Sequence, residues 1–227
     1  MKAVDLLKQL QENPEYIAAQ KEKQKELEKK EKEIRLAEAP FINEVQQIGF
    51  KEIKQSSDLL KYKNIPATLT NILIQWVPQI NNDYHSQEIL IRVLAISDIA
   101  FDGKFLINLF DNNHSSFSLK WAIANTIASA DILNIDKWIE EKLTSFHQEK
   151  QNEMLVYAAI KYFPYSKSNV FLRNLFDIFP LQVADAFAFI GKEDDLKYLQ
   201  QKRKEYKGEV RAGIDKAVSK LKKRIKN

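Results

Sequence analysis

The sequence of 227 residues contains no cysteine. This absence excludes disulfide bonds, a thiolate nucleophile and cysteine-ligated metal sites. Glycine is also scarce, with 5 residues in the chain, which disfavours sandwiches and barrels because these folds place glycine in many turns and bulges. The glycines form neither a Gly-x-Gly pattern nor a phosphate-binding loop that ends in Gly-Lys-Ser/Thr, so the common nucleotide cradles are not predicted.

Long apolar runs are absent too. No segment approaches the roughly 20 consecutive apolar residues that a membrane-spanning helix needs. The first ten residues are charged and lack the apolar core and small-residue cleavage site of a signal peptide. We therefore expect a cytoplasmic protein that does not enter a membrane.

Catalytic and metal-binding motifs are not evident either. The three histidines, His85, His114 and His147, lie far apart, and none has a partner at the i,i+4 spacing of helical metal ligands. We expect no metal and no cofactor. The same isolation of the histidines argues against a Ser-His-Asp triad, and no catalytic residue is assigned.

Charge is distributed unevenly along the chain. The formal net charge is +4, but residues 201–227 hold 11 Lys/Arg against 3 Asp/Glu, a local balance of +8. Residues 1–200 therefore carry −4. A mildly acidic body and a basic end should have different partners, and a basic patch suits an acidic protein, nucleic acid or a membrane surface.

A long helix is predicted near the N-terminus, where Asn13, Pro14 and Glu15 supply an N-cap, a proline in the first turn and an acidic side chain. We expect this helix to span residues 14–39, because Pro40 is a typical helix breaker. Residues 21–33 include eleven charged side chains in thirteen positions. With so few apolar positions, the helix should be mostly solvated and touch the body at its two ends.

Shorter helices are predicted on both sides of it, one around Val4, Leu7 and Leu10 and one over residues 41–48. From residue 61 onward, apolar residues recur at helical spacing in segments separated by short polar connectors, which predicts antiparallel neighbouring helices. The expected helices cover residues 66–77, 86–96, 103–110, 115–128, 135–143, 153–162, 168–179, 181–190, 194–203 and 210–225.

An internal repeat is visible in this region. Similar five-residue segments with a small residue near the middle start at Arg92, Lys120, Val156, Val183 and Arg211. Their spacings are 28, 36, 27 and 28 residues, and each segment follows a separate apolar helix. A helix pair of this kind cannot bury its apolar face alone, so stacking of successive pairs is the physical solution.

The pattern resembles the HEAT and armadillo-like α-solenoids, and the charged helix after Asn-Pro-Glu-Tyr resembles bacterial HEAT-repeat proteins of unassigned role. The resemblance implies an all-α, HEAT-like solenoid of about five helix pairs. Residues 1–60 would form an N-terminal helical cap, and residues 61–227 a repeat domain that ends in a basic capping helix at 208–226. An irregular all-α bundle is the alternative.

The leading functional hypothesis is a non-enzymatic module that binds another protein on the concave face of the solenoid, as an adaptor or a toxin-immunity-type inhibitor. Trp121 shares one side of its helix with Ser118 and Asn125, and tryptophan is enriched among interface anchors. The alternative is burial of Trp121 against the next repeat. The candidate partner-binding residues are Arg92, Lys120, Trp121, Asn125 and Arg211.

Nucleic-acid binding is the second hypothesis. In the last predicted helix, four lysines lie outside the apolar stripe and form a basic patch: Lys216, Lys220, Lys223 and Lys226. The alternative is a solvated capping helix whose cations complement its own C-terminal dipole. No aromatic residue other than Tyr206 interleaves these cations, which weakens base stacking.

A catalytic version of the second hypothesis is a HEAT-like DNA glycosylase, a family that removes alkylated bases with an acidic residue and tryptophans on a basic concave face. Trp121, Trp138 and Asp136 imitate that set, with Lys120 and Lys137 placed to meet phosphate. The acidic body argues against it, because phosphate neutralisation dominates DNA affinity, and Trp138 also fits a core position. An enzyme of another type is the third hypothesis.

Overall fold

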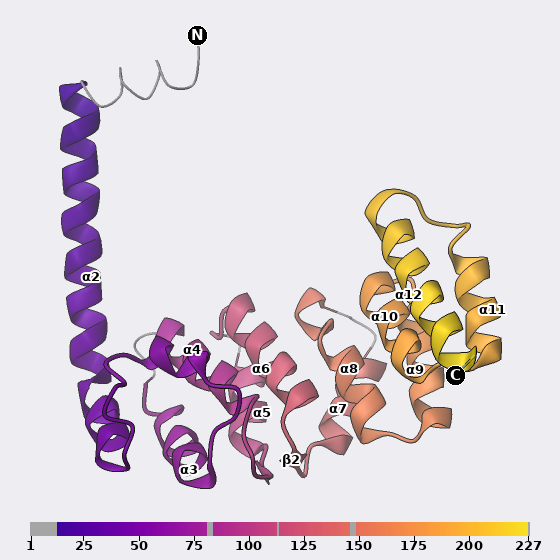
Figure 1. Ribbon diagram of the computed structural model, residues 1–227, viewed down its shortest axis with the longest axis horizontal. Helices are drawn as coiled ribbons and strands as arrows, with labels where there is room; N and C mark the ends of the chain where they lie inside the picture. Colours follow the sequence, from indigo (N-terminus) through magenta and orange to yellow (C-terminus); the bar gives the residue numbers. More distant parts are fainter. Residues whose placement is uncertain (1–12, 81–83, 113, 146–148, 227) are drawn as a thin grey trace.

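The computed structural model describes residues 13–80, 84–112, 114–145 and 149–226. The predicted helix around Val4, Leu7 and Leu10, and also His147, lie outside these residues. The chain is mostly helical (Figure 1), which confirms the all-α prediction. Within the described residues, the strands are two pairs of residues, β1 (Phe101–Asp102) and β2 (Ile132–Leu133).

The first described helix, α2 (Pro14–Gln47), begins as the sequence predicts. The side chain of Asn13 accepts hydrogen bonds from the backbone N–H groups of Glu15 at 2.9 Å and Tyr16 at 3.3 Å. Two of the amides that the first turn leaves without helical partners are thereby satisfied.

The predicted end of this helix at residue 39 is wrong, as is the separate helix at 41–48, because α2 continues through Pro40. Proline removes the hydrogen bond to the carbonyl four residues earlier. That carbonyl belongs to Leu36, which is exposed, so water can replace the lost donor. Beyond the proline, Phe41 and Val45 are fully buried, and their packing holds the last turns of the helix in place.

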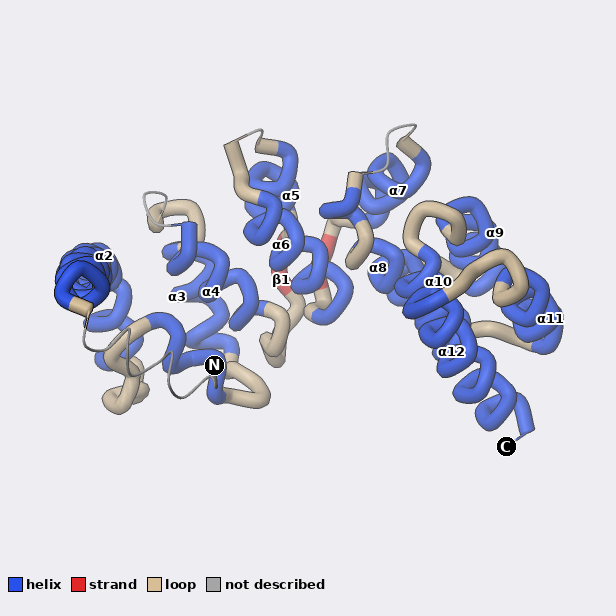
Figure 2. The backbone as a smooth tube through the Cα atoms, turned by 90° about the horizontal axis from the view of Figure 1, so that it is seen from above, coloured by secondary structure: helices blue, strands red, loops and turns tan. Residues whose placement is uncertain are grey.

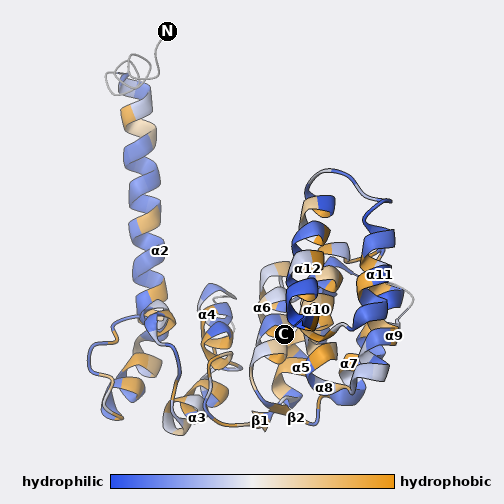
Figure 3. Cartoon of the chain, turned by 45° about the vertical axis from the view of Figure 1, so that its right-hand side comes forward, coloured by the Kyte–Doolittle hydropathy of each residue, from blue (hydrophilic) through white to orange (hydrophobic). Residues whose placement is uncertain are grey.

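The body contacts α2 at one end and not at the two ends that the sequence suggested. The buried side chains of α2 lie between Glu38 and Val45, whereas Tyr16 and Ile17 near its start are exposed. The rest of the helix projects away from the other helices as a mostly hydrophilic arm (Figures 1 and 3).

The remaining helices match the sequence-based segments closely. The links at residues 56–61 and 150–152 form short 3-10 helices that were not predicted, η1 (Ser56–Lys61) and η2 (Lys150–Asn152). The α-helices are α3 (Ala67–Trp76), α4 (Tyr84–Leu94), α5 (Lys104–Asp111), α6 (Phe117–Ser129), α7 (Asp136–Thr144), α8 (Leu155–Tyr162), α9 (Tyr165–Leu175), α10 (Pro180–Ile190), α11 (Glu193–Lys202) and α12 (Gly208–Lys226).

The helices after α3 form two rows along an arc (Figure 2). The inner row consists of α4, α6, α8, α10 and α12, and each of these helices contacts the next. The outer side of the arc is formed by α5, α7, α9 and α11. Four of the inner helices, α6, α8, α10 and α12, contain the repeated segments of the sequence, and α4 ends within the first segment.

One buried apolar cluster runs from Phe41 in α2 to Leu221 in α12, so packing is continuous across the predicted boundary between residues 60 and 61. Small residues let the inner helices approach closely. A Cβ atom at Gly213 in α12 would lie 2.3 Å from the side chain of Leu181 in α10, which only glycine permits without a shift.

Hydrogen bonds between loops join successive helix pairs along one edge. Strands β1 and β2 pair in parallel, and Ile65 forms a similar bridge with Ser97. Farther along, the hydroxyl of Tyr162 accepts the N–H of Ile132 at 3.0 Å and lies 3.1 Å from the carbonyl of Ala130. These edge ties, as we call them, were not predicted.

The part of the chain that the structure describes contains no helix that combines the length and the apolar character needed to cross a membrane.

Candidate interaction surface on the inner helices

A line of side-chain contacts runs across the inner row, and it begins at Arg92 in α4. The guanidinium group donates to Glu88 Oε1 from Nε at 2.9 Å and from Nη2 at 2.7 Å. Its central carbon lies 5.2 Å from the centre of the Trp121 ring in α6, a separation typical of a cation–π contact. Arg92 is thus held in place by its own helix while its cation faces the indole ring.

The line continues from Trp121 towards α10. The indole Nε1 donates to Glu153 Oε1 at 2.8 Å, and Gln182 Nε2 donates to Glu153 Oε2 at 3.1 Å. Glu153 lies just before α8, so one carboxylate joins side chains of α6 and α10. Each oxygen of this carboxylate accepts one hydrogen bond, so the bond to Gln182 helps to orient the acceptor of the indole N–H.

A second set of contacts joins α8, α10 and α12. The hydroxyl of Tyr157 lies 3.4 Å from Asp185 Oδ2, and Lys220 Nζ lies 3.0 Å from Asp185 Oδ1. Burial, followed by the nearby Asp185 charge, raises the pKa of Tyr157 to about 12, so the phenol stays protonated as a donor. We call the residues of the two sets the inner belt: Glu88, Arg92, Trp121, Glu153, Tyr157, Gln182, Asp185 and Lys220.

Exposed apolar side chains border the inner belt. Phe117 lies one helical turn before Trp121 on the same face of α6 and is 49% exposed. In α10, Leu181 and Phe189 are 41% and 55% exposed. Aromatic and arginine side chains among apolar neighbours are the composition typical of protein interface anchors.

The charge of the inner belt does not suit nucleic acid. It carries three carboxylates, on Glu88, Glu153 and Asp185, against two cations, on Arg92 and Lys220. Both cations are paired with carboxylates of the belt. A phosphate backbone would meet a net negative surface here, whereas nucleic-acid affinity depends on phosphate neutralisation.

The predicted partner-binding residues separate into two groups. Arg92 and Trp121 are brought together, and Asn125 lies half-buried one turn beyond Trp121. Lys120 instead places its ammonium group 5.7 Å from the centre of the Phe110 ring in α5, away from the indole. Arg211 is exposed near the start of α12 and has no contact with the inner belt among the described residues.

Sequence reasoning missed Glu88, Glu153, Tyr157, Gln182 and Asp185. A signal existed for all but Glu88, because the bonded pairs that join different helices of the belt are separated by 28 to 35 residues, close to the repeat length. Aligning the repeats and searching for acceptors one repeat after Trp121 would have found Glu153.

The residues suggested for a glycosylase do not form one site. Trp138 is 7% exposed and packs edge-on against Phe110 with ring centres 5.0 Å apart. Its Nε1 donates to Asp111 Oδ2 at 3.0 Å, so the ring is not available to stack on a base. Asp136 and Lys137 are exposed at the start of α7, in the outer row, whereas Trp121 belongs to the inner row.

The four lysines of the predicted basic patch lie in α12. Lys216, Lys220 and Lys223 share one face at helical spacing, and Lys220 is already paired with Asp185. Lys226 is exposed in the last turn, three residues after Lys223 and four after Lys222, so it continues this row at helical spacing. The four lysines therefore follow one another along one side of α12.

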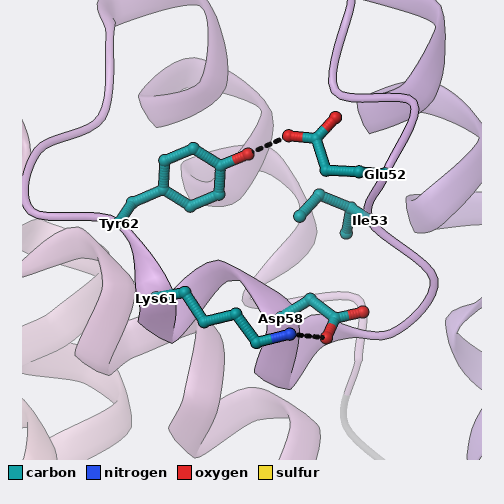
Figure 4. A pocket seen from close by; sticks show the side chains of 5 residues that line it. All are labelled: Glu52, Ile53, Asp58, Lys61 and Tyr62. Carbon is teal, nitrogen blue, oxygen red and sulfur yellow. Dashed lines mark hydrogen bonds and ion pairs between the residues drawn. The ribbon is translucent and has the colours of Figure 1, made fainter.

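A pocket of about 220 Å³ lies beside η1 (Figure 4). The hydroxyl of Tyr62 donates to Glu52, and Lys61 Nζ pairs with Asp58 at 2.7 Å. The bond to Glu52 raises the pKa of Tyr62 to about 12, and the bond to Tyr62 lowers the pKa of Glu52. Each titratable side chain of this pocket is paired with another, which favours a structural role.

Within the described residues, no group of histidine and carboxylate side chains is arranged to hold a metal ion. Comparison with known proteins finds no matching family model, no similar curated protein and no similar solved structure. The function must therefore be argued from the surfaces of the molecule itself.

Proposed function

We propose that this chain is a HEAT-like α-solenoid that binds another protein on its inner face. The pairs α3/α4, α5/α6, α7/α8, α9/α10 and α11/α12 supply the repeating unit. The observation that carries the functional part is the inner belt around Trp121, bordered by exposed Phe117 and Leu181.

The contacts of the belt support this proposal because they order its side chains before a partner arrives. An anchor that is already fixed loses little conformational freedom on binding. Trp121 is held by Glu153, and Arg92 is held by Glu88. An adaptor role or a toxin-immunity role would both use such a surface, without catalysis by this chain.

The proposal is tested by quantitative affinity capture from native lysate, followed by binding measurements with the purified captured protein. Phe117→Asp, combined with Trp121→Ala, should lower the affinity at least tenfold, because it replaces an exposed phenylalanine and the half-buried tryptophan of the belt. Val170→Asp is the matched control, since Val170 is 57% exposed on the outer helix α9. Retention of full affinity by the double variant would show that the inner face is not the binding surface.

Nucleic-acid binding remains the alternative function, and the observation in its favour is the basic α12. It predicts affinity for duplex DNA or RNA at about 50 mM salt that falls steeply as salt is added. Duplex binding that survives Phe117→Asp and is abolished by removing cations of α12 would favour this alternative over the proposal.

A further inference from the structure

A polar groove lies between α11 and α12, on the side of α12 away from the inner belt. The groove has a volume of about 1050 Å³. In α12, Lys222 lines the groove, whereas Lys220 belongs to the inner belt. A separation of two positions corresponds to a rotation of about 200° around a helix, so the groove and the inner belt lie on opposite sides of α12.

The walls of the groove are strongly basic. Its lining includes Lys197, Arg203, Lys204 and Lys222 against a single carboxylate, Asp215. Arg203 pairs with Asp215, and Lys197 lies 3.3 Å from the exposed Asp194. Exposed pairs of this kind contribute little, and within the described residues Lys204 and Lys222 form no ion pair at all.

We infer that this groove binds an extended acidic segment of another polypeptide. Asp215 is ionised at neutral pH, and the hydrogen bond from Arg203 lowers its pKa further. The ligand must therefore contact the surrounding cations and avoid this one carboxylate. Gln200, Gln201 and Ser219 also line the groove, and they provide donors and acceptors for a peptide backbone between the cations.

The dimensions fit such a segment. The 10 residues of α11 correspond to about 15 Å of helix, and about five residues of extended chain cover the same length. A segment with acidic residues at alternate positions would present one face of carboxylates to Lys204 and Lys222.

Nucleic acid fits the groove less well. No aromatic side chain is among the residues that line it, so bases would have no ring on which to stack. Tyr206 is nearby in sequence, but its hydroxyl donates to Asp177 at 2.9 Å and its ring packs against Phe176. Asp215 also interrupts the row of cations that a continuous phosphate backbone requires.

The inference is tested by fluorescence anisotropy with the full chain and a labelled peptide of about six alternating Glu and Ser residues. Lys204→Glu combined with Lys222→Glu should weaken binding at least tenfold. Lys216→Glu combined with Lys223→Glu is the matched control, because it makes the same change in net charge outside the groove and should weaken binding less than threefold. Ser219→Phe fills the groove without changing charge and should also weaken binding.

Three results would overturn the inference. The first is an equal loss in the two double variants, which would indicate non-specific attraction. The second is unchanged affinity in Ser219→Phe. The third is tighter binding of a single-stranded oligonucleotide of equal charge, which would indicate nucleic acid. Phe117→Asp should leave peptide affinity unchanged, so failure of this inference is distinguishable from failure of the proposed inner-face function.

Discussion

The helices α2 and α12 are both rich in charge but relate differently to the rest of the protein. Helix α2 contains seven Lys/Arg and eight Asp/Glu, and its buried side chains lie between Glu38 and Val45. In α12, seven Lys/Arg face two Asp/Glu, yet Ile214, Val218 and Leu221 form a buried stripe along the helix. Docking therefore follows the spacing of apolar residues and not the number or balance of charges.

The largest expected effect compares one leucine from each helix. Leu221 is fully buried in α12, whereas Leu27 is 48% exposed in α2. We expect Leu221→Ala to lower the free energy of unfolding by about 2–5 kcal/mol, and Leu27→Ala to change it by less than about 0.5 kcal/mol. Urea unfolding followed by circular dichroism measures both. Similar losses in the two variants would mean that α2 is packed along its length.

A second prediction concerns the base of α2. The buried carboxylate of Glu38 accepts hydrogen bonds from the Ser56 N–H at 2.9 Å and from the Ser86 hydroxyl at 2.7 Å. Glu38→Ala should lower the free energy of unfolding by about 1–3 kcal/mol, because it removes the acceptor of a buried backbone N–H. The exposed Glu28 in the same helix is the control, and Glu28→Ala should be nearly neutral in the same unfolding assay. A neutral Glu38→Ala would show that apolar packing alone holds the arm.

The smallest expected effect is a dependence on pH. The hydrogen bond from Arg203 lowers the pKa of Asp215 below its ordinary value of 3.8. A lowered pKa in the folded state stabilises the protein above the ordinary value, and this stabilisation is lost as pH falls through the folded pKa. Asp215→Asn should therefore be slightly less stable than the parent at pH 7, with the difference disappearing below about pH 4.

Glu31 provides the comparison in α2, where it lies 3.9 Å from Arg35 and both side chains are about 70% exposed. Glu31→Gln should leave thermal unfolding at neutral pH unchanged, because pairs with such exposure are screened by water. If Glu31→Gln lowered the stability at pH 7 more than Asp215→Asn does, the expectation that the Arg203–Asp215 pair contributes more than the Glu31–Arg35 pair would be wrong.

Local signals were enough to predict most helices. Asn13 caps α2 as the sequence indicated, and the side chain of Ser116 accepts the N–H of Leu119 at the start of α6, inside the helix predicted over residues 115–128. Both caps depend on residues within three positions of each other. Pro40 misled the prediction because its local preference is overridden by burial of Phe41 and Val45 against residues distant in sequence.

The candidate surface was predicted only in part for the same reason. The side that Trp121 occupies follows from helical periodicity, but its bond to Glu153 joins residues 32 positions apart. Trp138 is a similar case. Its burial was one of the two interpretations of the sequence, but its hydrogen bond to Asp111 joins residues 27 positions apart and requires the packing of α7 against α5. The edge ties escaped prediction because β1 and β2 are too short to show alternation.

The edge ties have a mechanical consequence. Strand β1 pairs with β2, Ile65 forms a bridge with Ser97, and the hydroxyl of Tyr162 accepts the N–H of Ile132. Hydrogen-bonded backbone stretches little, so the loops that these ties join, from Ile65 to Leu133, should keep their spacing when the helix pairs move. Movement of these helix pairs relative to one another should then be largest on the edge away from the ties.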